Sequence, residues 1–143
     1  MKITKENSTQ SKNIHGAEIL CIGSEILLGN IVNTNAQWIA EQLAFLGITH
    51  FRQTVIGDNP LRLKEAILES SNRSRILITT GGLGPTPDDI TTETIASAFN
   101  SPLEEREDLL IELKDKLEGK NYLLSDSQKK QCQVPPGSEI IKN

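Results

Sequence analysis

The sequence predicts an α/β fold in which a mostly parallel sheet is covered by helices on both faces. Three short apolar segments rich in β-branched residues, at 18–22, 49–56 and 76–80, have the length and composition of strands. A segment with helical spacing follows each of them, so the strand–helix order occurs three times. Such alternation is typical of parallel sheets joined by right-handed crossover helices.

The expected helices begin at residues that commonly cap a helix. The segment 33–35 offers N-cap candidates for the first long helix, and Gly47 is its expected stop. Its apolar residues recur at helical spacing: Ala36, Ile39, Ala40, Leu43 and Leu46. Asn59 as N-cap, with Pro60 in the first helical position, predicts the second helix. Thr91 is the expected N-cap of the third.

Residues 81–89, the glycine loop, join the third strand to the third helix and contain three glycines and two prolines. Glycine lets backbone N–H groups approach a ligand without an intervening side chain. A helix N-terminus behind such a loop attracts phosphate. The adjacent carboxylates of Asp88 and Asp89 would repel phosphate unless a hard cation such as Mg²⁺ lay between them. The loop therefore predicts a site for a phosphorylated ligand and a metal.

The same loop also allows purely structural interpretations. A Gly-Gly turn is often only a tight connection, and adjacent aspartates before a helix often only cap it. In an alternative register, Thr86 is the N-cap, Pro87 is the first helical residue and Asp89 is the capping-box acid. The loop is neither a Walker loop nor a dinucleotide-binding fingerprint, because Gly-Lys-Ser/Thr and G-x-G-x-x-G are both missing from it.

Polar residues of three loops are expected to meet at one edge of the sheet. Ligands of parallel α/β sheets bind outside the carboxyl ends of the strands, and all three loops leave those ends. The three loops are predicted at 23–35, 57–60 and 81–89, and each carries side chains suited to binding. In addition to the glycine loop, the first two loops bring Ser24, Glu25, Asn33, Asn35 and Asp58.

Composition and charge restrict the classes of function. The 143 residues suffice for one domain with a core, and the formal net charge of −4 argues against a nucleic-acid surface. The two cysteines, Cys21 and Cys132, do not suggest a disulfide framework, and Cys21 lies in an apolar run where burial is expected. No apolar run reaches transmembrane length, and residues 1–16 lack the apolar segment of a signal peptide. We therefore expect a cytoplasmic domain at 17–143 that follows a disordered tail and contacts no membrane.

The C-terminal third is expected to hold one helix and one short strand. The helix is predicted at 103–118 and ends at 119–121, and its charged face is expected to be solvated. The segment 122–133 is ambiguous. A turn is predicted at 134–138, and a short strand at 139–141.

Three motifs, in this order and spacing, carry a resemblance to a known family: GSEILLGNIVNTN at 23–35, QTVIGDNP at 53–60 and ITTGGLGPTPDDITTETIA at 78–96. Together they are similar to the N-terminal domain of the CinA (competence/damage-inducible protein A) family. That domain resembles the molybdopterin-binding fold of the MoaB/Mog proteins. The resemblance covers roughly residues 17–142 and implies a three-layer α/β/α fold.

The resemblance implies a hydrolase, a divalent-metal-dependent ADP-ribose pyrophosphatase that uses Mg²⁺ or Co²⁺. In the related molybdopterin adenylyltransferases, the aspartates associated with metal and nucleotide chemistry fall on Asp58 and Asp89. Asp88 is expected to be a more peripheral metal ligand, and Glu25 is a candidate general base. The residues expected to bind substrate are Ser24, Asn33, Asn35, Gly81, Gly82, Leu83, Gly84 and Thr86.

Two other functions stay open at this point. The same loop would serve molybdopterin binding, or adenylyl transfer to molybdopterin. A non-catalytic domain that only binds a ligand or partner is the third interpretation, because the family continues with a Thr-Ala-Pro-Gly segment that does not occur here. The family's Asn before a Lys-Gln pair is also replaced, since Ser127 and Gln128 precede 129–131. The domain is therefore expected to be incomplete at its C-terminus. Its expected partners are ADP-ribose or molybdopterin and, in a homo-oligomer, further copies of the chain.

Overall fold

The central sheet contains three parallel strands in the order β2-β1-β3. The protein is described by a computed structural model that covers residues 16–118 and 124–141, so the expected tail and the predicted helix end at 119–121 lie outside the described residues. The strands are β1, Ala17–Ile22; β2, His50–Ile56; and β3, Ile76–Thr80. Their pairing confirms the predicted parallel sheet.

The crossover helices begin at their predicted caps in two of three cases. The side chain of Asn33 accepts a hydrogen bond from the Ala36 N–H, and that of Asn59 accepts one from the Arg62 N–H. Gly47, with a φ of 71°, follows the end of the first crossover helix, as expected. The crossover helices are α2, Thr34–Phe45; α3, Pro60–Arg73; and α4, Thr91–Ala98.

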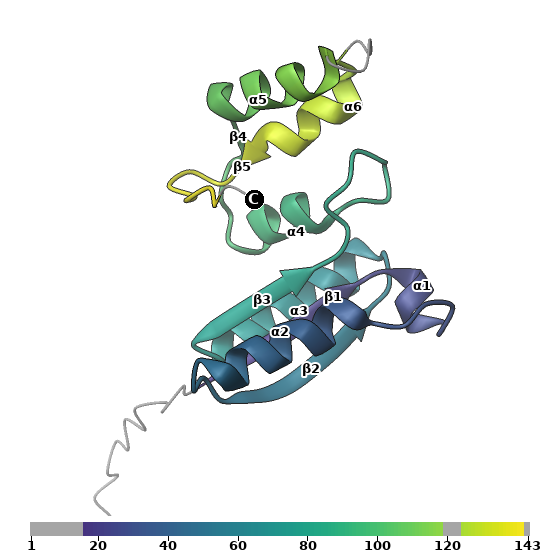
Figure 1. The fold of residues 1–143 in the computed structure, drawn as a ribbon, viewed down its shortest axis with the longest axis vertical. Coiled ribbons are helices and arrows are strands. Elements are labelled where there is room, and N and C mark those ends of the chain that lie inside the picture. Colours follow the sequence, from purple (N-terminus) through teal and green to yellow (C-terminus); the bar gives the residue numbers. More distant parts are fainter. Residues whose placement is uncertain (1–15, 119–123, 142–143) are drawn as a thin grey trace, which may run out of the picture.

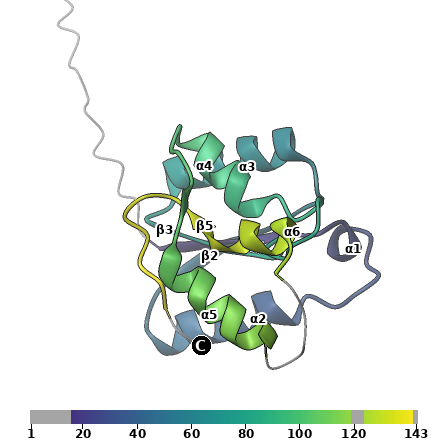
Figure 2. The ribbon, with the colours of Figure 1, turned by 90° about the horizontal axis from the view of Figure 1, so that it is seen from above.

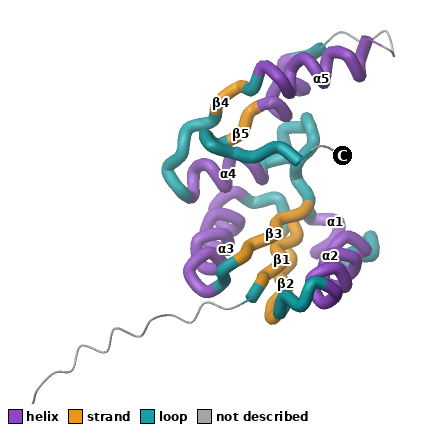
Figure 3. Tube along the Cα trace, turned by 60° about the vertical axis from the view of Figure 1, so that its left-hand side comes forward, coloured by secondary structure: helices purple, strands orange, loops and turns teal. Residues whose placement is uncertain are grey.

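Strand β1 is buried on both sides because it lies between two apolar cores. Ala17, Ile19 and Cys21 pack against α2 on one face of the sheet. Leu20 and Ile22 pack against α3 and α4 on the other face. Figure 2 shows α2 on one side of the strands and α3 with α4 on the other, and Figure 3 shows α2 and α3 separated by the strands. This arrangement confirms the predicted three layers.

A smaller outer unit follows α4 in the chain. Its two short strands pair in the antiparallel direction, and Figure 1 shows the unit beyond α4 as seen from the sheet. A 3₁₀ turn, η1, leads into the second of these strands. The elements of the outer unit are β4, Glu104–Glu105; α5, Glu107–Glu118; α6, Asp126–Lys129; η1, Lys130–Cys132; and β5, Gln133–Val134.

Two sequence predictions for the outer unit are wrong. The helix predicted at 103–118 begins only at Glu107, because β4 occupies the preceding residues and pairs with β5. The segment 139–141 is not a strand, since the strand of this region is β5, which precedes the turn. The turn itself is confirmed, and the Ser138 N–H donates to the Pro135 carbonyl at 3.2 Å.

The expected burial of Cys21 is confirmed. Cys21 and Cys132 are both buried, and neither forms a disulfide. Across residues 16–118 and 124–141, no helix has both the length and the apolar character needed to cross a membrane.

Candidate functional site

The turn that leaves β3 requires glycine at its first two positions. Gly81 and Gly82 have φ values of 97° and 59°, in the left-handed region that other residues rarely adopt. A Cβ atom at Gly81 would collide with the carbonyl oxygen of Ile22, and one at Gly82 would collide with the hydroxyl of Thr91. The backbone of the glycine loop therefore packs directly against the end of β1.

Thr91 joins the start of α4 to this turn, and it is not the N-cap that the sequence predicted. It is the first residue of α4, and the N-cap is Ile90, whose side chain makes no capping bond. The Thr91 hydroxyl donates to the carbonyl of Gly81 at 2.8 Å, and its N–H donates to the carbonyl of Gly82 at 3.1 Å. Thr91 is fully buried. Its hydroxyl holds the turn instead of capping the helix.

Asp89 closes the far side of the glycine loop. Its Oδ2 atom accepts hydrogen bonds from the Thr86 N–H at 2.9 Å and from the Thr86 hydroxyl at 2.5 Å. These bonds, together with one from the Gly84 backbone, lower the pKa of Asp89 and keep its carboxylate ionised. These hydrogen bonds between Thr86 and Asp89 resemble those expected in the alternative register, in which Thr86 is the N-cap and Asp89 is the capping-box acid. No helix follows at Pro87, however, because α4 begins only at Thr91.

Ser24 and Asp58 join the first two loops by reciprocal hydrogen bonds. The Ser24 N–H donates to Oδ2 of Asp58 at 2.9 Å, and the Asp58 N–H donates to Oγ of Ser24 at 3.1 Å. The loop predicted at 23–35 therefore includes a short helix, α1 (Ser24–Leu27), for which Asp58 supplies the acceptor. The side chain of Glu25 folds back over Gly23. A Cβ atom added at Gly23 would lie 2.6 Å from the Oε1 atom of Glu25.

Asn33 and Asn35 lie at the start of α2, and Asn35 joins this helix to the end of β3. The Asn33 Oδ1 atom caps α2 through the Ala36 N–H at 3.2 Å. Its Nδ2 atom is buried and has no hydrogen-bond partner among the described residues. Asn35 donates from Nδ2 to the Thr80 hydroxyl, at the end of β3, at 3.3 Å. The buried Nδ2 of Asn33 is therefore a donor that a ligand oxygen could satisfy.

The predicted metal ligands do not form a carboxylate cluster. Within the part of the chain that the structure describes, no three or more His, Cys, Asp or Glu side chains are grouped so as to hold a metal ion. One oxygen each of Asp58 and Asp89 is already bonded, to Ser24 and Thr86 respectively, and Asp88 is exposed. Mg²⁺ is usually held by one or two carboxylates together with substrate phosphates. The metal site therefore stays a prediction, and it would need the phosphates of a ligand to complete the coordination of the ion.

Two side chains from the outer unit reach the glycine loop, and sequence reasoning missed both. Lys130 donates from Nζ to the Asp89 carbonyl at 2.5 Å and forms an ion pair with Glu93 at 3.3 Å. Gln131 donates from Nε2 to the Leu83 carbonyl at 3.1 Å. These hydrogen bonds span 41 and 48 residues of sequence, so local periodicity does not predict them, and the Lys-Gln pair of the family resemblance was the one signal available. Lys130 and Gln131 also line a cavity of about 20 Å³ beside the loop.

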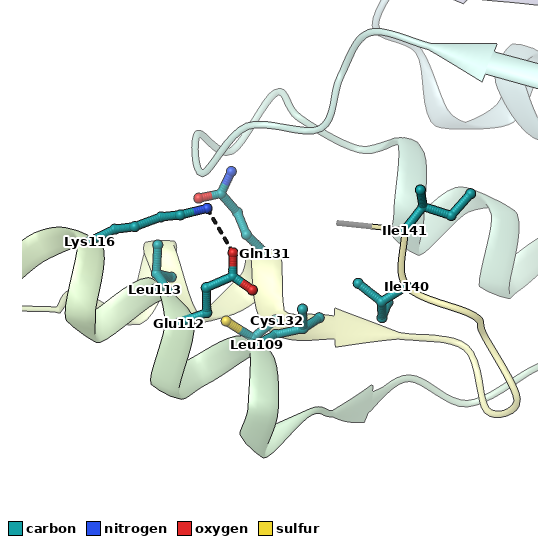
Figure 4. Close-up of a pocket in the computed structure, with 8 residues that line it drawn as sticks. All are labelled: Leu109, Glu112, Leu113, Lys116, Gln131, Cys132, Ile140 and Ile141. Atoms are coloured by element: carbon teal, nitrogen blue, oxygen red, sulfur yellow. Dashed lines mark ion pairs between the residues drawn. The ribbon is translucent and has the colours of Figure 1, made fainter. Parts of the chain in front are cut away.

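Two larger cavities lie in the outer unit. Their volumes are about 350 and 540 Å³, and both are lined by α5 and by residues near the end of the described chain. Figure 4 shows the first of them, where Glu112 and Lys116 pair with each other at 2.9 Å. Apart from the polar Gln131, its other lining is apolar: Leu109, Leu113, Cys132, Ile140 and Ile141. Apolar side chains and a mutually neutralised pair attract phosphate weakly, so the glycine loop is the better candidate for a phosphorylated ligand.

Comparison with protein families and curated proteins gives consistent matches. Residues 18–140 match the family described as "Probable molybdopterin binding domain". A CinA-like protein of Prochlorococcus marinus (strain NATL1A) is 72% identical over 143 residues, which are 100% of this chain and 33% of the relative. The chain thus spans about a third of the length of the curated relatives it matches.

Solved structures share the fold. CinA of Thermoplasma acidophilum, described as a protein of unknown function, matches with a TM-score of 0.81 and 33% identity, over 89% of this chain and 74% of that one. The molybdopterin biosynthesis enzyme MoaB of Thermus thermophilus matches with a TM-score of 0.54 and 24% identity, over 57% of this chain and 52% of that one. The second match is evidence of fold alone. Together they confirm the predicted MoaB/Mog-like α/β fold and the similarity to CinA.

Proposed function

Because the chain belongs to the family of probable molybdopterin binding domains and is CinA-like, we propose that its glycine loop binds the phosphates of a nucleotide-type small molecule. One observation carries this proposal. Gly81 and Gly82 turn with positive φ where no Cβ fits, and the N-terminus of α4 follows the loop. Bare backbone before a helix N-terminus offers N–H donors and a favourable dipole to an anion.

The reaction that we propose at this site is hydrolysis of the diphosphate of ADP-ribose. Water adds across the P–O–P bridge, the bridging oxygen leaves with one phosphate, and AMP and ribose phosphate result. Glu25, exposed at the start of α1, is the proposed base that takes the proton of the water. The loop amides and the free donor of Asn33 would orient the phosphates and the ribose. Ser24 and Asn35 would complete the binding edge.

Mg²⁺ or Co²⁺ is part of this proposal. Asp58 and Asp89 would hold the ion against the ligand's phosphates, and Asp88 would lie at the periphery. When bound, such an ion polarises the phosphoryl oxygens and offsets the charge that develops on them. The lowered pKa of Asp89 supports this role, because an ionised carboxylate is what a hard cation prefers.

Molybdopterin binding, with or without adenylyl transfer, is the second candidate. The family description and the MoaB-like fold favour it. Molybdopterin carries a terminal phosphate, for which the same loop amides would serve. The two candidates therefore share the phosphate site and differ in what occupies the rest of the edge.

The test is hydrolysis of ADP-ribose with and without Mg²⁺ or Co²⁺, by the unmodified chain and by Asp89→Asn. Asp108→Asn is the matched control, because Asp108 is an exposed aspartate of α5 that pairs with Arg106. The proposal predicts metal-dependent hydrolysis that is lost in Asp89→Asn and kept in Asp108→Asn. Saturable binding of molybdopterin without any hydrolysis would support the second candidate. Neither hydrolysis nor binding would refute both and leave a non-catalytic partner-binding domain.

A further inference from the structure

We propose that Lys130 and Gln131 are positioning residues, which hold the glycine loop from the outer unit and thereby set its affinity for a phosphorylated ligand. This inference rests on the proposed function of the same loop. The two side chains bond to the carbonyls of Asp89 and Leu83, near the two ends of the loop. The residues between these two points include the exposed tip at 86–88.

These bonds restrain the loop in a way that its internal bonds do not. Thr86 and Asp89 bond to each other, so they shape the loop without fixing it to the rest of the molecule. Lys130 and Gln131 come from a distant part of the chain and fix it from outside. The Lys130 side chain is only 23% exposed. A partly shielded hydrogen bond from an ammonium group contributes more than an exposed surface pair.

Lys130 also offsets negative charge at the glycine loop, where a phosphorylated ligand would add further negative charge. Asp88, Asp89 and Glu93 place three carboxylates on the loop and in the first turn of α4. Lys130 Nζ lies 3.3 Å from a Glu93 oxygen and so offsets the charge of the acid in the first turn of α4. Without this ammonium group, a phosphate at the N-terminus of α4 would meet uncompensated repulsion.

The element that carries the two side chains is itself anchored. Both residues lie in η1, next to Cys132, which is buried. The Cys132 carbonyl accepts a hydrogen bond from the Arg106 N–H at 2.9 Å, and β5 follows and pairs with β4. Groups on a supported element can hold a site in place, whereas groups on a free segment cannot.

The test compares Lys130→Met, Lys130→Arg and Gln131→Leu with the unmodified chain. Lys129→Met is the matched control, because the neighbouring Lys129 bonds to Asp126 within its own helix, at 2.8 Å. Two quantities are measured: the amide hydrogen-exchange rates of the glycine loop and of β1, and the affinity for ADP by calorimetry. If ADP-ribose is hydrolysed, KM and kcat are measured as well.

In Lys130→Met we expect loop exchange to accelerate and ADP affinity to fall, each by about 10- to 100-fold, the range for loss of one hydrogen bond from a charged group. Exchange in β1 stays unchanged, and KM rises more than kcat falls. Gln131→Leu shows a smaller loss, Lys130→Arg retains most of the affinity, and Lys129→Met behaves like the unmodified chain. In the Lys130→Met background, Glu93→Gln restores part of the affinity.

Unchanged loop exchange in Lys130→Met, or an equal effect in Lys129→Met, would overturn the inference. If the unmodified chain binds no ADP and hydrolyses no ADP-ribose, the proposed function fails. The exchange rates still decide whether Lys130 and Gln131 hold the loop, so the two failures are distinguishable. Acceleration in β1 equal to that in the loop would also overturn the inference, because it would show general destabilisation.

Discussion

Removing Arg73 should destabilise the fold more than removing any ordinary surface arginine, because Arg73 compensates a buried carboxylate. Glu18 lies in β1 and is 0% exposed. It accepts hydrogen bonds from Arg73 at 2.9 and 2.5 Å and from the Ser70 hydroxyl at 2.9 Å. Arg52 lies farther away, at 3.9 Å. Without Arg73, Glu18 would keep one neutral donor and one distant charge.

The expected loss is large on the scale of domain stability. Removing one partner of a buried ion pair costs about 3–5 kcal/mol, because the other charge is left uncompensated. The free energy of unfolding of a domain of this size is roughly 5–15 kcal/mol, so the expected loss is a substantial fraction of it. Replacing both partners by methionine should cost much less than Arg73→Met alone, because no buried charge then remains.

The free energy of unfolding is measured by urea denaturation for Arg73→Met, for Glu18→Met with Arg73→Met, and for Arg75→Met as an exposed control. The reasoning predicts a loss of about 3–5 kcal/mol for Arg73→Met and less than about 0.5 kcal/mol for the control. If Arg73→Met costs no more than Arg75→Met, the pair does not compensate a buried charge and the reasoning is refuted.

The pair should also appear in the pH dependence of stability. Burial alone would raise the pKa of Glu18, but the hydrogen bonds from Arg73 and Ser70 outweigh it and leave the pKa below its ordinary value of 4.5. Since the folded state holds this proton more weakly than the unfolded chain, the contribution is fully present above pH 4.5 and is lost as pH falls through the folded-state value. Denaturation midpoints measured from pH 6 downward should therefore fall less steeply in the double methionine variant.

Three further predictions concern single hydrogen bonds. Asn59→Ala removes the N-cap of α3 and should lower the urea-derived unfolding free energy by about 1 kcal/mol, and no loss would mean that the cap contributes nothing. Thr91→Val leaves the carbonyl of Gly81 without its hydroxyl donor and should cost about 1–3 kcal/mol in the same assay, whereas a neutral result would exclude Thr91 as the anchor of the turn. Thr86→Val removes the largest cause of the lowered pKa of Asp89, so NMR titration should show that pKa rise toward its ordinary value of 3.8, and an unchanged pKa would place the cause elsewhere.

The sheet and the glycine loop could be predicted because their signals are local. The apolar runs, the Asn59-Pro60 start and the glycines each reflect a requirement of neighbouring backbone. Gly81 illustrates this, since its positive φ and the carbonyl of Ile22 leave no room for a side chain. The order of strands and helices predicts which loops share an edge. The Ser24–Asp58 hydrogen bonds join the first two loops, and the Asn35–Thr80 hydrogen bond joins the start of α2 to the end of β3.

The remainder depends on contacts between distant residues. The local pattern predicts a helix at 104–105, but these residues pair with 133–134 as a strand. No local pattern predicts that pairing. Thr91 has the residue type of an N-cap, but a nearby carbonyl takes its hydroxyl. Local patterns did not place Lys130 beside the glycine loop, because it bonds to the carbonyl of Asp89, which lies 41 residues away in the sequence. Local propensity yields to tertiary contacts in each of these cases.

Mapping the ADP site by NMR tests the central claim most directly. Amide chemical shifts of the unmodified chain are followed during titration with ADP, with and without Mg²⁺. If the glycine loop binds the phosphates, the largest shifts occur at the amides of 81–84, 86, 88 and 89 and at the first turn of α4, and α5 is unaffected. Shifts confined to the cavity residues of α5 and Ile140, or saturable binding without any change in the glycine loop, would contradict the account.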